Sequence, residues 1–136
     1  MPVLFSLSDH PRIFTTIWTG RVTPEEMLES YRAFLESDRW DRRELEFADF
    51  SEADLSEIDV KSLKELCELI GDHYQRHGIT EARCASWIPR DINQSLLEIY
   101  NYLSKQSPEV TRVFTVKSSA LDWLLSSGEQ AMEMSA

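Results

Sequence analysis

The segment 48–59 combines the residue types that three kinds of site would use. Its sequence is ADFSEADLSEID, in which carboxylates alternate with small hydroxyl side chains after a short apolar run. Such a stretch is compatible with a metal loop, with a phosphoacceptor loop, and with a plain turn between a strand and a helix. An EF-hand counted from Asp49 requires glycine at its sixth position and glutamate at its twelfth. The chain has Asp54 and Val60 there, so we predict no calcium site.

Three serines, Ser51, Ser56 and Ser62, precede or begin the helix that is expected after this segment. A phosphate at a helix N-terminus is stabilised by the free N–H groups of the first turn. Helix capping uses the same residues with no modification. We favour capping, in which Ser56 or Asp59 closes the first turn of the helix.

Other patterns that carry chemistry are incomplete in this chain. His73 and His77 share one helical face at a spacing that suits zinc, but Tyr-Gln-Arg between them lacks the glutamate of a metalloprotease. The four glycines do not cluster, and there is no G-x-S-x-G string. We therefore predict a non-catalytic protein with no metal and no cofactor. An enzyme stays the third hypothesis, and it requires a deep polar pocket around His10 or around this histidine pair.

Composition limits the partners. The net charge is −10 over 136 residues, which argues against nucleic-acid backbones and anionic membrane surfaces. Cys67 and Cys84 form no C-x-x-C motif and are interpreted as core residues in a reducing compartment. The sequence has no signal-peptide pattern and no apolar run of about 18 residues, so we expect a cytoplasmic location that is not membrane-embedded.

Strands and helices are expected to alternate along the chain. Runs rich in β-branched and aromatic residues predict strands over 3–8, 13–20, 45–50, 83–88 and 111–116. Apolar residues at helical spacing, with capping signals before them, predict helices from Pro24 to about Ser37, from about Asp59 to His77, from Asp91 or Asn93 through Leu103, and over a short stretch from Ser118.

This order, β-β-α-β-α-β-α-β-α, predicts an α/β fold. Right-handed crossovers between the later strands give a mixed, mostly parallel five-stranded sheet with helices packed against it, and the first hairpin adds the antiparallel strand. We predict one domain over residues 1–126 and a flexible tail over 127–136.

Three strings resemble the STAS superfamily, and more narrowly the SpoIIAA-like group related to bacterial anti-sigma-factor antagonists. They are WTGRVTPEEMLESYRAFLESDRWD, LEFADFSEADLSEIDVKSL and TRVFTVKSSALDWLL, and the resemblance covers nearly the whole chain. It implies a STAS-like fold and a regulatory role in a bacterial cytoplasm. In phosphorylated members the acceptor follows the second aspartate of an Asp-Leu-Ser … Ile-Asp-Ser-Ser-Gly-Leu string. Here 49–51 and 58–59 match, but Val60 occupies the acceptor position, so we do not predict phosphorylation.

The predicted fold indicates where binding occurs. In an open α/β sheet, ligands and partners contact the loops at the carboxyl ends of the strands. We therefore predict that a protein partner binds the loop before the second helix and the adjacent strand-end loops. The predicted binding residues are Asp49, Ser51, Asp54, Ser56, Trp87, Arg90, Asn93 and Lys117.

An alternative function comes from the same resemblance. The SpoIIAA-like group is also similar to lipid-binding domains of the Sec14 type, which implies a carrier or sensor of a small apolar ligand. Its cavity would be lined by the aromatic residues Trp18, Trp87, Tyr100 and Tyr102. A homodimer formed through exposed aromatic residues of the first hairpin or first helix is left open.

Overall fold

Five strands form one sheet in the order in which they occur along the chain. The structure is a computed structural model that describes residues 2–89 and 94–135, apart from the side chains of 94, 106 and 127–135. The strands are β1 (Val3–Leu7), β2 (Ile13–Arg21), β3 (Leu45–Asp54), β4 (Ala82–Trp87) and β5 (Glu109–Phe114). β1 is antiparallel to β2, and all other neighbours are parallel. The predicted mixed, mostly parallel α/β sheet is confirmed.

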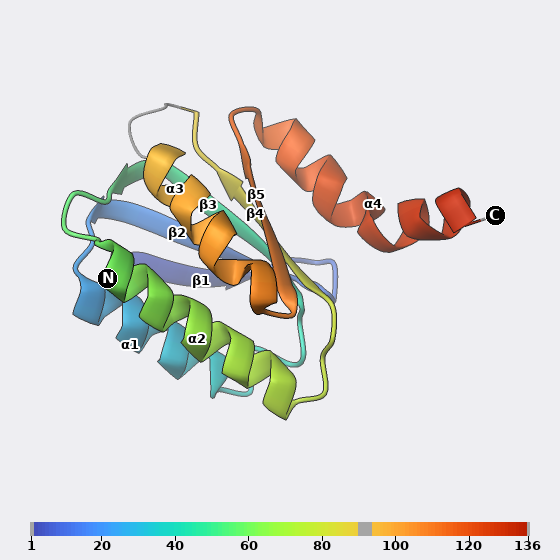
Figure 1. Cartoon of the computed structure of the whole chain (residues 1–136), viewed down its shortest axis with the longest axis horizontal. Coiled ribbons are helices and arrows are strands. Elements are labelled where there is room, and N and C mark those ends of the chain that lie inside the picture. The colour runs from blue at the N-terminus through green and yellow to red at the C-terminus, as the bar shows by residue number, and fades with distance from the viewer. Residues whose placement is uncertain (1, 90–93, 136) are drawn as a thin grey trace.

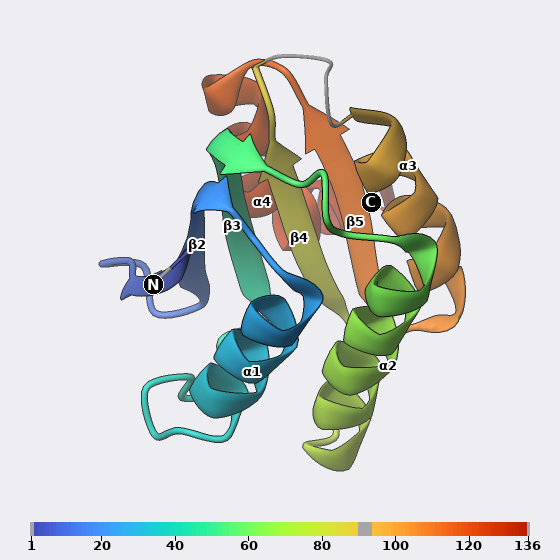
Figure 2. The same cartoon turned by 90° about the vertical axis from the view of Figure 1, so that its left-hand side faces the viewer.

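The helices cover the two faces of this sheet unequally. They are α1 (Pro24–Leu35), α2 (Val60–Arg76), α3 (Gln94–Leu103), the 3-10 helix η2 (Ser104–Gln106) and α4 (Lys117–Ser135). α1, α2 and α3 lie on one face, and α4 lies on the other (Figures 1 and 2). We refer to these as the α1–α3 face and the α4 face.

Local capping fixes the start of the first two helices. The Thr23 hydroxyl accepts a hydrogen bond from the Glu26 N–H at 3.2 Å, and the Glu26 carboxylate accepts one from the Thr23 N–H at 3.1 Å. Asp59 accepts from the Ser62 N–H at 2.8 Å, and its own N–H donates to the Ser62 hydroxyl at 3.1 Å. These reciprocal pairs satisfy donors that the helix leaves free. The capping interpretation is confirmed, with Asp59 as the cap.

Several boundaries differ from the prediction. β3 continues to Asp54 instead of ending at Phe50, because its last residues pair with Thr19–Arg21 of β2 beyond a register shift. β5 begins at Glu109, two residues before the predicted start. α4 runs for 19 residues, which is longer than the short helix expected from Ser118. The division into a domain over 1–126 and a flexible tail over 127–136 stays a prediction.

Both faces of the sheet are packed with apolar side chains, as a parallel sheet requires. The α1–α3 face carries the larger cluster, which includes Phe14, Trp18, Phe50 and Ile88. The α4 face carries a smaller cluster of the buried residues Ile13, Leu45, Phe47, Ala85, Ala120 and Leu124. Both cysteines are free and buried, which confirms their interpretation as core residues.

In the part of the chain that the structure describes, none of the helices has the length and apolar character that a membrane span needs. The cytoplasmic location stays a prediction.

Candidate functional site

Two of the predicted site residues meet at the carboxyl ends of the strands on the α4 face. Lys117, the first residue of α4, places its ammonium group 5.5 Å from the ring centre of Trp87 and 6.0 Å from that of Phe47. The Trp87 indole N–H donates to the Thr115 carbonyl at 3.3 Å. Trp87 is therefore half-buried beneath the Lys117 ammonium group. Trp87 is the last residue of β4, and the arrowhead of β4 ends at the upper rim of the sheet in Figure 2.

Asp49 and Ser51 belong to the same rim. Asp49 is the register partner of Trp87 on the neighbouring strand, so both side chains point to the α4 face. Asp49 accepts hydrogen bonds from the Ser51 N–H at 2.9 Å and from the Ser51 hydroxyl at 2.6 Å. We define the rim cluster as Phe47, Asp49, Ser51, Trp87 and Lys117.

Asp54 and Ser56 form a separate turn between β3 and α2. Asp54 is the last residue of β3 and accepts a hydrogen bond from the Ser56 N–H at 3.0 Å. The hydrogen bonds from Ser56 lower the pKa of this exposed carboxyl. Among the described residues, no hydrogen bond or ring contact joins this turn to the rim cluster. The segment 51–54 is therefore strand and not the loop that we predicted, because it extends the pairing with β2.

Arg90 and Asn93 lie outside the described residues, and so does the predicted cap of α3. Their place in the site stays a prediction.

The serines differ in access. Ser62 is buried at the third position of α2, and its hydroxyl donates to the Asp59 carbonyl at 2.9 Å. Ser51 is engaged by Asp49, whereas Ser56 is exposed. Val60, which the sequence resemblance aligns with the phosphoacceptor, is the first residue of α2 and is half exposed.

The two histidines serve packing between α2 and the loop before β3. Their ring centres are 4.4 Å apart, and Trp40 lies edge-on at 4.2 Å from the ring of His73. Burial, and then the charges of His77 and Arg76, lower the pKa of His73 to about 4. Among the described residues, no group of three His, Cys, Asp or Glu side chains could hold a metal ion. The His73 ring borders a polar groove between α1 and α2, and the described residues that line this groove include no serine, threonine, cysteine or lysine.

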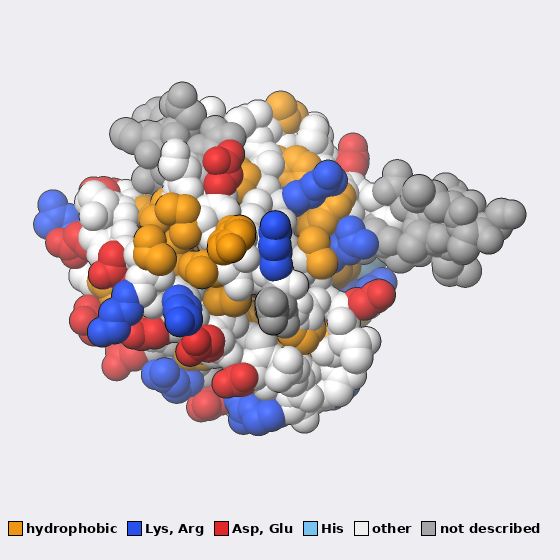
Figure 3. Space-filling view, in the orientation of Figure 1, with side chains coloured by type: hydrophobic (Ala, Val, Ile, Leu, Met, Phe, Trp, Pro, Cys, Tyr) orange, Lys and Arg blue, Asp and Glu red, His pale blue; other side chains and the backbone are white. Residues whose placement is uncertain are grey.

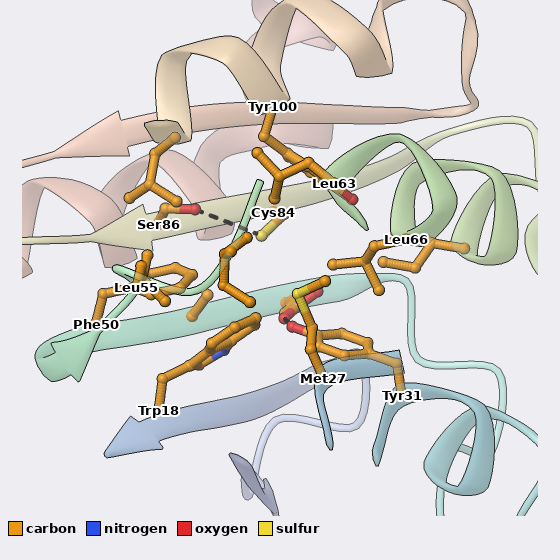
Figure 4. Close-up of a pocket in the computed structure, with 15 residues that line it drawn as sticks. Trp18, Met27, Tyr31, Phe50, Leu55, Leu63, Leu66, Cys84, Ser86 and Tyr100 are labelled. Carbon is orange, nitrogen blue, oxygen red and sulfur yellow. Dashed lines mark hydrogen bonds between the residues drawn. The ribbon is translucent and has the colours of Figure 1, made fainter. Parts of the chain in front are cut away.

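The interior of the α1–α3 face contains a small cavity (Figure 4). It lies between the sheet and the three helices, and Trp18, Met27, Leu63, Cys84 and Tyr100 are among the side chains that point toward it. Its volume is about 30 Å³, which is room for about two water molecules. Pockets that bind drug-sized ligands have volumes of roughly 300–1,000 Å³, so this cavity holds no such ligand unless the helices move.

The aromatic residues of the carrier alternative therefore do not form one lining. Trp18 and Tyr100 border the cavity, but Trp87 is on the α4 face and Tyr102 is 70% exposed. Two of the aromatic residues of the first hairpin, Phe14 and Trp18, are buried in the core. Phe5, the third aromatic residue of the hairpin, is partly buried, and a homodimer through the first hairpin or the first helix stays a prediction.

Sequence reasoning missed two buried carboxyl groups on the α1–α3 face. Glu46 is 2% exposed and accepts hydrogen bonds from the hydroxyls of Tyr31 at 2.5 Å and Thr16 at 2.8 Å. Burial raises its pKa, and these hydrogen bonds reduce the shift. Glu109 is also 2% exposed, and one of its carboxyl oxygens has no hydrogen-bond partner among the described residues. Burial and the charge of Glu46 raise the pKa of Glu109 well above its ordinary value.

We expect Tyr31→Phe to lower the free energy of unfolding by about 1–3 kcal/mol at pH 7. The substitution removes the donor nearest to Glu46 and leaves a buried carboxyl less well satisfied, at nearly constant volume. Urea unfolding followed by circular dichroism measures this change. Tyr102→Phe is the control, because that side chain is exposed. Equal stability of Tyr31→Phe and the parent chain would show that the Tyr31–Glu46 hydrogen bond contributes nothing.

The arrangement of strands and helices is similar to that of a known crystal structure. This is an uncharacterised protein from the DUF3478 family with a SpoIIAA-like fold, from Shewanella loihica PV-4. The two chains are 20% identical, the match covers 90% of this chain and 91% of that chain, and the TM-score is 0.53. The predicted SpoIIAA-like fold is thereby confirmed. Neither a protein-family model nor a curated protein matches the chain.

Proposed function

We propose that this chain is a non-catalytic STAS-like module that binds a protein partner through the rim cluster and the turn after β3. The observation that supports it best is the half-buried Trp87 beneath Lys117, with Asp49 on the adjacent strand. Tryptophan is among the residues that contribute most to protein–protein binding, and a charge of each sign beside it sets orientation and partner choice.

The position of the rim cluster also favours this function. It lies at the carboxyl end of β4, where ligands and partners of open α/β sheets bind, beside the middle of β3. Val116 beside it is about half exposed, which extends the apolar area next to Lys117. The interior cavity has a volume of only about 30 Å³, so the carrier alternative requires α1, α2 and α3 to move away from the sheet. We therefore favour partner binding.

The test compares affinity purifications from a lysate of the source organism. A tagged full-length chain is the bait, and Trp87→Ala and Lys117→Glu are the variants. We expect at least one co-purified protein to fall about tenfold or more with Trp87→Ala, because an interface tryptophan contributes about 2 kcal/mol or more. Lys117 is exposed, so Lys117→Glu tests the same surface with little risk to folding.

A matched control lies on the opposite side of the molecule. The Lys105 ammonium lies 5.2 Å from the ring centre of Tyr102, which repeats the cation-over-aromatic geometry of the rim cluster. Tyr102 belongs to α3, over which hydrophobic side chains gather beside basic ones in Figure 3. Tyr102→Ala and Lys105→Glu should leave the co-purified protein unchanged. Equal recovery by all four variants would contradict binding at the rim.

A further inference from the structure

We propose that the free edge of β1 is a second interaction surface, which binds an extended segment of a partner protein as an added strand. β1 is the outermost strand on its side of the sheet and runs alongside α1 (Figure 1). Its sequence, VLFSL, has no charged residue, proline or glycine. Edge strands that avoid pairing usually carry such residues, so β1 lacks the common protection against strand addition.

The ladder to β2 establishes which backbone groups face outward. The Thr19 N–H donates to the Pro2 carbonyl at 2.8 Å, and the Ser8 N–H donates to the Ile13 carbonyl at 3.3 Å. Bonded and non-bonded pairs alternate in an antiparallel ladder. Leu4 and Ser6 therefore bond to β2, whereas the backbone groups of 3, 5 and 7 point away from the sheet.

One of these outward groups is already engaged by a side chain. Arg39 donates from Nη2 to the Phe5 carbonyl at 2.9 Å, and its guanidinium lies 5.8 Å from the ring centre of Phe34. Within residues 2–89 and 94–135, no hydrogen bond reaches the other outward N–H and C=O groups of residues 3, 5 and 7. A strand that docks here offers its own N–H to Phe5 and releases Arg39 to pair with a carboxylate of the incoming segment.

A groove beside this edge accepts the side chains of the added strand. Its volume is about 550 Å³, and Val3, Phe5, Ala33 and Phe34 form its apolar surface. α1 follows β2 and returns along the sheet, so it runs in the same direction as β1. Glu26 and Glu29 on its first half therefore lie toward the Val3 end of the groove, and Arg39 lies toward the other end.

This distribution of charge defines the occupant. It is an extended segment with alternating apolar residues, a basic residue at the Glu26 and Glu29 end, and an acidic residue at the Arg39 end. In an antiparallel addition the acidic residue comes first along the partner chain. Backbone hydrogen bonds supply affinity, and the alternate side chains in the groove supply specificity.

The probe is the synthetic peptide acetyl-Glu-Val-Thr-Val-Thr-Val-Lys-amide, titrated into the ¹⁵N-labelled full-length chain. We expect amide shifts and slower hydrogen exchange at Val3, Phe5 and Leu7, with little added protection at Leu4 and Ser6. The charge-reversed peptide, with Lys first and Glu last, should bind about threefold to tenfold more weakly, because two end contacts become repulsive.

A variant of the chain tests the backbone contact itself. Leu7→Pro removes one outward N–H and leaves the ladder to β2 intact, so binding should fall about tenfold; Leu7→Thr retains the N–H and should bind normally. The proposal is overturned by no binding at millimolar peptide, by shifts outside β1 and α1, by equal affinity for both peptides, or by dimerisation of the free chain that protects the same three amides. The two-peptide comparison uses the unmodified chain and does not depend on the folding of Leu7→Pro.

Discussion

Glu109→Gln is expected to stabilise the protein by about 1–3 kcal/mol at pH 8, the cost of a buried polar group without a partner, and to leave its stability unchanged at pH 4. The native side chain is buried in the α1–α3 face, where Tyr100 reaches one carboxyl oxygen at 3.4 Å and the other oxygen has no partner among the described residues. Glutamine has nearly the shape of the neutral acid, so the substitution removes the ionisation and little else.

The direction of the pH dependence follows from the raised pKa. In the folded chain, burial and the nearby Glu46 hold the proton on Glu109 above the pH at which the unfolded chain releases it. The folded state then binds more protons than the unfolded state, and stability falls as the pH rises. The contribution of Glu109 is complete below the ordinary carboxyl pKa of 4.5 and is lost progressively above it.

Urea unfolding of both proteins from pH 4 to pH 8 measures this difference, and the comparison at each pH cancels the titrating groups that do not interact with Glu109. Glu98→Gln is the matched control, because Glu98 lies on the exposed side of α3. Its difference from the parent should stay near zero at every pH. A stability difference for Glu109→Gln that does not change with pH would contradict a buried, protonated carboxyl.

Trp40→Ala is expected to lower the free energy of unfolding by about 4 kcal/mol at pH 7. Trp40 is 4% exposed and anchors the loop between α1 and β3 to α2, with its ring 4.2 Å from that of His73 and 4.9 Å from that of His77. Its indole N–H donates to the Arg43 carbonyl at 2.7 Å. The substitution leaves a cavity, removes this hydrogen bond and admits water to His73.

The same substitution should change the titration of His73. The pKa of this imidazole is lowered to about 4 by burial, so its contribution to stability is present above pH 6.5 and is lost as the pH falls toward 4. In Trp40→Ala the NMR-monitored pKa should rise toward the ordinary value. Trp40→Phe, which retains an aromatic ring, is the control and should cost about half as much. A loss below about 1 kcal/mol for Trp40→Ala would show that the loop does not depend on this anchor.

Local signals in the sequence were sufficient for most of the fold. Thr23 with Glu26, and Asp59 before an apolar helical stripe, marked the starts of α1 and α2 because capping depends on neighbouring residues alone. The ends of strands depend on partners elsewhere in the chain. β3 extends to Asp54 because β2 continues beside it, and no local pattern contains that information.

The candidate site was predicted in part. Asp49 is the register partner of Trp87 at the end of β4, Ser51 is hydrogen-bonded to Asp49, and the start of α4 brings Lys117 onto Trp87. Asp54 and Ser56 are near in sequence but lie in a separate turn. Glu46 was missed although a signal existed: a central parallel strand is buried on both faces, so a glutamate within LEFADF had to be enclosed.

The most direct test of partner binding is hydrogen–deuterium exchange of the full-length chain, measured alone and in complex with the co-purified protein whose recovery falls in the Trp87→Ala variant. We predict slower exchange in 49–56, 86–88 and 115–119, and no change in the Tyr102–Lys105 region of α3 and η2. Protection confined to the helices around the interior cavity, or absent from the ends of β3 and β4, would contradict binding at the rim.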